Sequence, residues 1–462
     1  MSAQLDAALA HVDAHLEQSL ERLKALVRIK SISTDPAYAE ECRRAADWLV
    51  ADLQSQGFEA SARATPGHPI VVGHDLTGEG PHVLFYGHYD VQPVDPVELW
   101  DSDPFEVTMK PGPGGETQIV ARGASDDKGQ LLTFVEACRA WRAVASKLPV
   151  KVSMLFEGEE ETGGKSLPGF LESAAAELKA DVALVCDTDM WDAKTPAVTA
   201  MLRGLVGEEI EITCASMDLH SGMYGGAARN PNHVLAEILA SLHNPDGSIA
   251  VAGVYDDVEE LPPAVAEQWR HLGFDEAEFL GSVGLSIPAG EKGRSVLQQI
   301  WSRPTCEING MIGGYTGDGF KTVIPAKASA KVSFRLVARQ DPVKIREAFR
   351  AHVRARVPAD CSVNFLEHGA SAAIAVPTEG AHLRNTVKAL TDEWGREAAI
   401  IASGGSIPVV GEFKRKLGMD TLLVGYALDD DRIHSPNEKY NLTSFHKGIR
   451  SWVRILAALA AR

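Results

Sequence analysis

Short apolar runs that are followed by small or acidic residues constrain the fold of this chain most strongly. They occupy 82–86 (HVLFY), 150–156 (VKVSMLF) and 182–185 (VALV). These runs are too short for helices and are typical of buried strands. Helical patterns over 130–146 and 168–178 lie between them. The alternation predicts an α/β layer with a mixed, largely parallel sheet.

The two ends of the chain continue this α/β character. Apolar residues recur at steps of three and four over 5–27, which predicts an amphipathic helix, and a second helix is expected over 40–56. Towards the other end, the pattern predicts a helix over 381–394, a strand over 421–424 and a final helix over 442–459.

The middle of the chain has a different pattern, which begins near Arg203. Apolar and polar residues alternate there, as in strands with one exposed face. Residues 244–300 are rich in proline, glycine and acids and are interpreted as an excursion. The expected elements are strands over 206–213, 328–337 and 362–366 and helices over 231–243 and 342–357.

We therefore expect an α/β catalytic domain interrupted by an inserted α+β domain. The first part of the catalytic domain covers residues 1–202, the inserted domain covers 203–376, and the second part of the catalytic domain covers 377–462.

Charge and cysteine content narrow the class of protein. Lysine and arginine number 45 against 63 acids, so the formal net charge is −18, which argues against nucleic-acid or anionic-membrane partners. No apolar run reaches the roughly 18 residues of a membrane helix, and the start lacks the pattern of a secretory signal. The scattered cysteines predict buried thiols of a cytoplasmic protein: Cys42, Cys138, Cys186, Cys214, Cys306 and Cys361.

Five polar segments follow apolar runs, and we expect the first four to lie on consecutive strand ends. His88 follows the first run, and Asp90 lies two residues on, where a carboxylate orients a ligating imidazole. The alternative is a core histidine with an acidic neighbour. Asp126 and Asp127 stand at a strand–helix junction, where the alternative is a helix N-cap.

The acids 159–161 directly follow the second apolar run. A solvated face is the alternative there, but three carboxylates at a sheet end repel one another unless a cation offsets them. Asp187 and Asp189 follow the third run, and His434 lies in a polar loop. Together these residue types predict a site for two metal ions. Imidazole and carboxylate suit Zn²⁺.

Eight motifs in this order resemble the M20 metallopeptidase family, and within it the cytosolic nonspecific dipeptidases and carnosinases. They are GHYDVQP, RGASDDKG, EGEEETGG, CDTDMW, DLHSGMYGG, KTVIPAK, GGSIP and HSPNEK. The resemblance implies a zinc-peptidase catalytic domain interrupted by a lid domain that also forms a homodimer.

The resemblance also implies the metal ligands. Asp126 matches the bridging ligand, and its bond to Asp127 matches a cis peptide. Asp187 rather than Asp189 matches a ligand, because it lies nine residues before Pro196. The implied ligands of the two divalent ions, with zinc favoured over manganese or cobalt, are His88, Asp126, Glu161, Asp187 and His434.

Other residues acquire roles from the same resemblance. Glu160 matches the general base and Asp90 the residue that orients His88. His220 matches a histidine that reaches the partner subunit's site across the dimer interface. The matched substrate-binding positions are Thr322, Arg335 and Ser406. Glu159 fills a position that is often uncharged in the family.

The primary hypothesis is a di-zinc dipeptidase acting on short peptides with a free C-terminal carboxylate. The metals lower the pKa of a bound water, and Glu160 takes a proton from it. The resulting hydroxide, which bridges the metals, attacks the scissile carbonyl, and Glu160 later delivers the proton to the leaving amine. Arg335 holds the substrate carboxylate, and His220 stabilises the oxyanion. The alternatives are a deacylase or carboxypeptidase acting on N-acyl amino acids and, from another class, a non-catalytic dimeric binding protein.

Overall fold

The chain divides into two units in the computed structural model, which describes residues 2–376, 380–404 and 407–461. Unit 1 comprises Met1–Ala200, Val376–Ile401 and Pro408–Arg462, and unit 2 comprises Met201–Ala375 and Ala402–Ile407. The boundaries expected from the sequence, 202/203 and 376/377, remain a prediction about domain organisation.

Unit 1 contains most of the helices and the largest sheet. Its helices are α1 (Ser2–Ala14), α2 (Leu16–Val27), α3 (Ala39–Ser55), α4 (Lys128–Val144), α5 (Leu167–Ser173), α6 (Ala175–Leu178), α13 (Ala381–Trp394), α14 (Pro408–Glu412) and α15 (Leu442–Ala460), with short turns η1 (Pro36–Tyr38), η2 (Val97–Leu99), η3 (Pro113–Gly115), η4 (Glu160–Thr162) and η5 (Phe413–Leu417). Its strands are β1 (Glu59–Arg63), β2 (Ile70–Asp75), β3 (His82–His88), β4 (Thr108–Pro111), β5 (Thr117–Val120), β6 (Lys151–Glu157), β7 (Val182–Val185), β17 (Thr421–Leu423) and β18 (Lys439–Asn441), while β8 (Ala197–Leu202) and β16 (Ala399–Ser403) contain residues of both units.

The central sheet has the strand order β1-β2-β6-β3-β7-β17-β8. β3 runs parallel to both β6 and β7, and β7 runs parallel to β17. The pairs β1–β2, β2–β6 and β17–β8 are antiparallel. The predicted mixed, largely parallel sheet is therefore confirmed. A separate antiparallel sheet contains β4, β5 and β18.

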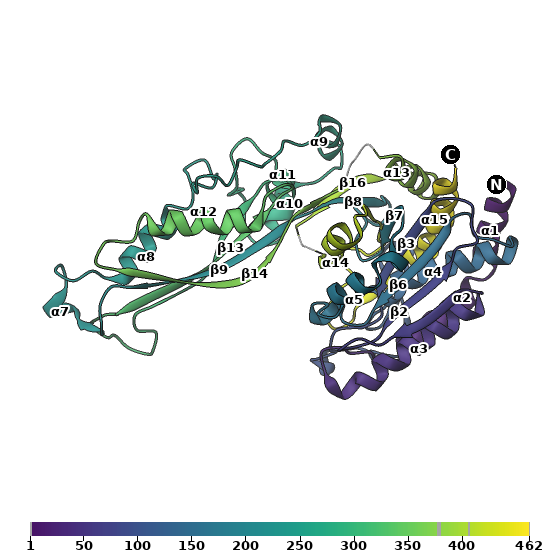
Figure 1. Cartoon of the computed structure of the whole chain (residues 1–462), viewed down its shortest axis with the longest axis horizontal. Helices are drawn as coiled ribbons and strands as arrows, with labels where there is room; N and C mark the ends of the chain where they lie inside the picture. Colours follow the sequence, from purple (N-terminus) through teal and green to yellow (C-terminus); the bar gives the residue numbers. More distant parts are fainter. Residues whose placement is uncertain (1, 377–379, 405–406, 462) are drawn as a thin grey trace. The chain divides into compact units, whose positions relative to one another are not determined.

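Helices cover both faces of this sheet (Figure 1). Successive residues of a strand point to opposite faces, and β3 illustrates this. Phe85 stacks on Phe134 of α4 at a centroid distance of 3.8 Å and meets Trp452 of α15 edge-on. Tyr86 meets Phe413 of η5 at 5.9 Å on the other side. Burial on both faces explains why the β3 segment is a continuous apolar run.

Two expected helices are each divided into two. The helix expected over 5–27 is interrupted at His15, which has the non-helical angles φ −121° and ψ 17°. The helix expected over 168–178 is α5 and α6, with Ala174 between them. Continuous apolar spacing therefore predicted both helical faces but not these breaks.

Unit 2 is built on an antiparallel sheet with the order β11-β13-β9-β14. Its strands are β9 (Gly204–Thr213), β10 (Leu219–His220), β11 (Thr305–Gly313), β12 (Val323–Ile324), β13 (Lys327–Leu336), β14 (Ser362–Ser371) and β15 (Ile374–Ala375), and its helices are α7 (Ser221–Tyr224), α8 (Pro231–Ala240), α9 (Pro263–Arg270), α10 (Glu276–Gly281), α11 (Val296–Trp301) and α12 (Pro342–Arg354). The predicted excursion at 244–300 thus contains three short helices.

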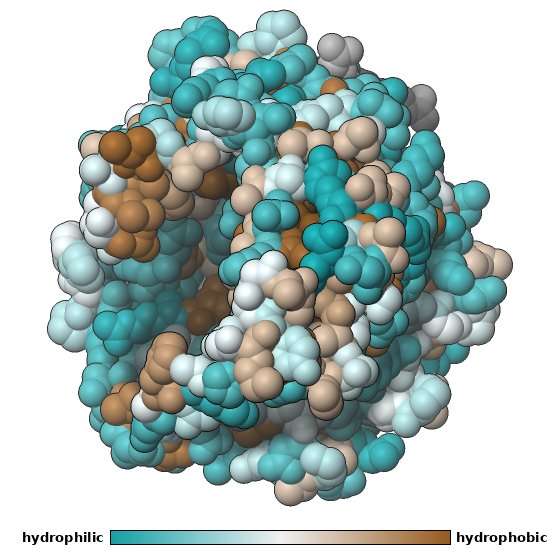
Figure 2. Space-filling model, turned by 90° about the vertical axis from the view of Figure 1, so that its left-hand side faces the viewer, coloured by the Kyte–Doolittle hydropathy of each residue, from teal (hydrophilic) through white to brown (hydrophobic). Residues whose placement is uncertain are grey.

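Several large apolar side chains of unit 2 are exposed. Figure 2 views the side that carries α7 and shows apolar surface among hydrophilic surface. Met311 and Ile312 on β11 are 57% and 64% exposed. Because β11 stands at one edge of the four-stranded sheet, the backbone groups on its outer side have no partner strand among the described residues.

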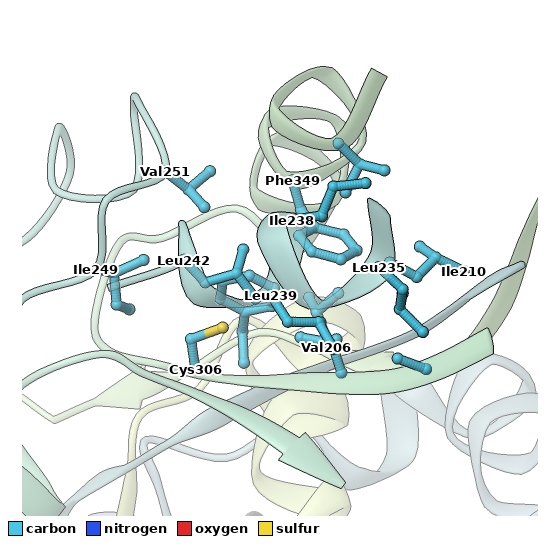
Figure 3. Close-up of a cluster of buried hydrophobic side chains, with 14 of the residues drawn as sticks. Val206, Ile210, Leu235, Ile238, Leu239, Leu242, Ile249, Val251, Cys306 and Phe349 are labelled. Carbon is cyan, nitrogen blue, oxygen red and sulfur yellow. The ribbon is translucent and has the colours of Figure 1, made fainter. Parts of the chain in front are cut away.

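One face of the unit 2 sheet holds a buried apolar core (Figure 3). Buried and half-buried residues alternate along β9, as expected of a strand with one covered face. Val206 and Ile210 of β9 cluster with Leu235 of α8 and Phe349 of α12. The alternating pattern in the sequence thus correctly predicted an α+β arrangement.

The prediction that all cysteines are buried thiols is wrong for two of them. Cys214 follows β9 and Cys361 precedes β14, and both are half-buried. Their sulfur atoms lie 2.8 Å apart. Adjacent strand ends bring together residues that are far apart in the sequence.

Among the described residues, the structure contains no helix that is both long and apolar enough to cross a membrane.

Candidate metal centre

His88 ends β3 in a fully buried position. Its Nε2 lies 3.0 Å from Oδ1 of Asp126, and its Nδ1 lies 3.1 Å from the carbonyl oxygen of Asp90 and 3.4 Å from Oδ1 of that residue. Asp90 is itself held, because Ser33 Oγ donates to its Oδ2 at 2.6 Å. The structure thus brings Asp90 to the side of the imidazole opposite Asp126.

Asp126 and Asp127 lie in the loop before α4 and are joined by a cis peptide bond, so that prediction is confirmed. Asp127 is the N-cap residue of α4, but its side chain does not cap the helix. It accepts instead from the backbone N–H of His88 at 3.0 Å. A Cβ atom at Gly87 would lie 2.7 Å from this carboxylate, so the close approach requires glycine.

The expectation that the first four segments end consecutive strands is wrong for Asp126. The preceding strand, β5, ends at Val120 and belongs to the smaller sheet with β4 and β18. A short polar loop links β5 to α4, and this loop carries the carboxylates. The apolar content of β5 did not show to which sheet the strand belongs.

Glu161 and His434 come from other parts of the chain and approach the carboxylate of Asp126. Glu161 lies in η4, which begins three residues after the end of β6, and Gly163 follows that turn with a φ of 86°. His434 Nε2 lies 2.9 Å from Asp126 Oδ2 and 3.3 Å from Glu161 Oε2. His434 has a positive φ of 63°. This backbone conformation is uncommon for a residue other than glycine and often occurs at functional sites.

The potential ligands form two groups that share Asp126. One group is His88, Asp126 and Asp187, and the other is Asp126, Glu161 and His434; within each, the ligand atoms lie within 4.8 Å of one another. Oδ1 of Asp126 faces one imidazole and Oδ2 faces the other. This is the arrangement that a bridging carboxylate requires.

The titration behaviour follows from burial and from this packing of charges. Burial acts to raise the pKa of Asp126, but the imidazoles of His434 and His88 hold it below its ordinary value. Burial raises the pKa of Asp187 well above its usual range. Burial also raises the pKa of Glu160 to about 7, with help from neighbouring carboxylates.

These residues fit a pair of divalent cations. Burying carboxylates beside one another is unfavourable because each disfavours the ionised form of its neighbours, and a cation removes that penalty. Two imidazole nitrogens together with carboxylate oxygens are a ligand set suited to Zn²⁺. Glu160 belongs to neither group, although it lies beside Glu161 in η4.

The remaining predicted site residues belong to unit 2. His220 ends β10, is exposed, and accepts from the backbone N–H of Gly222 at Nδ1, 3.0 Å away, so the capping contact exists. Thr322 lies beside it, since its carbonyl oxygen accepts from the backbone N–H of Ser221. Arg335 is half-buried on β13, opposite Leu205 of β9. Ser406 lies outside the described residues.

Comparison with known proteins gives the family. The model of peptidase family M20/M25/M40 matches residues 84–458 of this chain. The chain belongs to this family.

Several relatives of this M20 peptidase are similar over nearly their whole lengths. It is 31% identical over 480 residues to Cys-Gly metallodipeptidase dug1 of Schizosaccharomyces pombe, covering 100% of this chain and 99% of the relative. It is 28% identical over 480 residues to Beta-Ala-His dipeptidase of Homo sapiens, covering 99% and 93%. The solved structure of the M20 family metallo-carboxypeptidase Sso-CP2 from Sulfolobus solfataricus matches with a TM-score of 0.79 at 30% identity, covering 96% and 99%. The predicted family and enzyme class, a peptide-bond hydrolase, are confirmed.

The M20 peptidase also contains a buried carboxylate, Glu438, to which sequence reasoning assigned no role. It accepts from Arg122 Nη1 at 2.7 Å and from the backbone N–H groups of Gly123, Ser125 and Asp126 at 2.9–3.0 Å. Burial raises its pKa, but all four contacts are donors, which only the ionised form fully accepts. Glu438 thus holds the loop that presents Asp126, and the motif HSPNEK contained no sign of this contact.

Replacing Glu438 by glutamine should lower the free energy of unfolding of unit 1 by about 3–5 kcal/mol, because removing one partner leaves Arg122 as an uncompensated buried charge. Urea-induced unfolding of the metal-free protein, followed by tryptophan fluorescence, measures this. Glu106→Gln is the matched control. Its partner Arg28 is 51% exposed, so the change should stay below about 1 kcal/mol. Equal effects of the two substitutions would contradict the role of Glu438.

Proposed function

We propose that this M20 peptidase is a di-metal dipeptidase that hydrolyses short peptides with a free C-terminal carboxylate. The observation that carries the proposal is the position of Asp126 between two groups of potential ligands. The similarity, over nearly the whole length, to one protein named as a metallodipeptidase and another named as a dipeptidase supports it.

The ligand chemistry supports two ions per subunit, with zinc favoured over manganese or cobalt. We assign one ion to His88, Asp126 and Asp187 and the other to Asp126, Glu161 and His434. When bound, the ions supply Lewis acidity that lowers the pKa of a water molecule and polarises the scissile carbonyl.

Glu160 is assigned the role of general base. It takes a proton from the attacking water and delivers it to the leaving amine. Its half-buried position in η4, next to the proposed ligand Glu161, supports this assignment. Asp90 is assigned the orientation of His88, supported by the contacts of its carboxylate and carbonyl oxygens with Nδ1.

Arg335 is assigned the role of binding the C-terminal carboxylate of the substrate. Among the described residues, no carboxylate forms an ion pair with Arg335, which leaves its planar donors available for a bidentate contact. Burial, with a contribution from the nearby charge of Arg335, lowers the pKa of Arg203 to about 10. The charge of Arg203 thus adds to that of Arg335 and favours an anion nearby. Thr322 and Ser406 are assigned further substrate contacts.

Arg335→Lys should raise KM and lower turnover, because a point-charge ammonium replaces the bidentate fork. Losing one hydrogen bond to a charged group costs about 1.5–3 kcal/mol, which corresponds to a fall in kcat/KM of roughly 10- to 100-fold. Steady-state kinetics on a dipeptide measure it. Arg339→Lys is the control, since Arg339 is exposed and pairs with Glu259. Unchanged kinetics in Arg335→Lys would place the substrate carboxylate elsewhere.

Unit 2 is assigned the roles of lid and homodimer interface. The exposed apolar residues of β11, together with the unpaired backbone of an edge strand, supply a surface suited to a second copy. His220 is assigned the role of donating a hydrogen bond to the oxyanion that forms in the partner subunit's site. The net charge of −18 speaks against nucleic-acid partners, and the cytoplasm is the proposed compartment.

A second candidate function is favoured by the similarity to a solved metallo-carboxypeptidase. The same metal centre with a different pocket suits removal of a C-terminal residue from longer or N-acylated substrates. A non-catalytic binding protein is disfavoured because a pure binder needs no base such as Glu160 beside the ligands.

Hydrolysis assays with two sets of substrates test the proposal. The metal-free protein, reloaded with Zn²⁺, Mn²⁺ or Co²⁺, is given a library of dipeptides and the matching N-acetylated amino acids, and free amino acids are quantified. Preferential release from dipeptides supports a dipeptidase. Preferential release from N-acetylated substrates supports the second candidate. No release with any metal would contradict both.

A further inference from the structure

We propose that Gln92 is a positioning residue for one of the two metal ions, the one assigned to Asp126, Glu161 and His434. This inference rests on the proposed function. Gln92 Nε2 donates to Glu161 Oε2 at 2.7 Å in a partly buried position. Gln92 therefore lies beside a candidate ligand and donates to the same carboxylate oxygen that faces His434, where it fixes the orientation of the carboxylate.

The chain holds Glu161 at two points through one segment. The backbone N–H of Glu161 donates to Asp90 Oδ2 at 3.1 Å. Two residues after Asp90, the side chain of Gln92 donates to the side-chain carboxylate of Glu161. Val91 between them donates its backbone N–H to Ser31 at 3.0 Å. The segment 90–92 is thus fixed to a neighbouring loop, and its two polar side chains fix both the backbone and the carboxylate of residue 161.

The chemistry of the amide suits this position. An ionised carboxylate only accepts hydrogen bonds, so the NH₂ group of Gln92 must face Glu161. Lysine or arginine would also donate, but each would add a positive charge beside a cation site. A neutral donor orients the carboxylate and leaves its negative charge for the ion. Removing a residue that hydrogen-bonds to a metal ligand typically lowers the metal affinity 10- to 100-fold.

The effect should be confined to one ion. Among the described residues, the side-chain hydrogen bond of Gln92 goes to Glu161, which belongs to one ligand group only. The other group depends on His88, which contacts with Asp127 and the Asp90 carbonyl hold, and on Asp187. A residue that merely stabilised the fold would not distinguish between the two ions.

Zinc titration of the metal-free protein, by calorimetry with a competing chelator, tests the inference. The wild type should bind two ions. Gln92→Leu should bind one ion with wild-type affinity and the other 10- to 100-fold more weakly. Gln92→Asn should behave alike, because its shorter amide does not reach Glu161. Gln54→Leu is the matched control, since Gln54 donates to Ala60 on the exposed surface.

Two background variants identify the affected ion. In His434→Ala, where the Glu161 ion is already weakened, adding Gln92→Leu should leave the remaining ion unchanged. In Asp187→Ala, adding Gln92→Leu should weaken the remaining ion 10- to 100-fold. Wild-type affinity for both ions in Gln92→Leu, or equal weakening of both, would overturn the inference alone. Fewer than two ions in the wild type would overturn the proposed function as well.

Discussion

Glu160→Gln should lower kcat by about 10²–10⁴-fold, the usual contribution of a general base, while the protein still binds two metal ions. Glutamine has nearly the same shape but cannot take a proton from the attacking water. Glu160 belongs to neither group of potential ligands, so the substitution removes no ligand. Single-turnover kinetics together with metal analysis of the same sample measure both quantities.

The adjacent acids of the same turn supply matched controls. Glu159→Gln should leave kcat within a few-fold of wild type, because Glu159 Oε2 faces the backbone N–H of Ser166 at 3.3 Å. Glu161→Gln should lose metal together with activity, because it is a proposed ligand. If Glu160→Gln loses metal in proportion to activity, it behaves as a ligand and the proposed role is wrong.

Local signals in the sequence predicted where most elements begin. The helices expected from Pro231 and Pro342 begin at those residues, since Asn230 and Asp341 accept from the backbone two residues on and proline suits the first turn. Their ends were less predictable. The helix expected to reach 243 ends at Ala240, and no capping residue in the sequence indicated this end.

Contacts between distant segments could not be predicted from local patterns. β6 inserts between β2 and β3, an order that no periodicity encodes. Glu438 and Arg122 are 316 residues apart, and each alone resembles an ordinary surface charge. Strand ends and family motifs named the candidate ligands, whereas the side chains that hold those ligands emerged only from the folded geometry.

His220→Ala should lower kcat by about 10²–10³-fold, the usual cost of removing an oxyanion donor, without loss of metal. The alternative is that His220 only caps α7, since its Nδ1 accepts from Gly222. His220→Asn separates the two roles. Asparagine is a good N-cap but has no imidazole Nε2 to donate. Capping alone predicts wild-type activity in His220→Asn, whereas an oxyanion role predicts a loss in both variants.

Mixed dimers test whether His220 acts in the partner subunit's site. One protomer carries His220→Ala and the other carries Glu160→Gln, so each homodimer alone is inactive. A two-fold interface gives both sites the same contact. If His220 acts across it, one site combines an intact Glu160 with an intact His220 from the other chain, and the mixed dimer should recover about half of the wild-type activity. If His220 acts within its own chain, every site lacks one of the two groups. Tagged protomers, co-refolded and purified through both tags, give the mixed species. Inactivity of that confirmed heterodimer would show that His220 does not reach the other site.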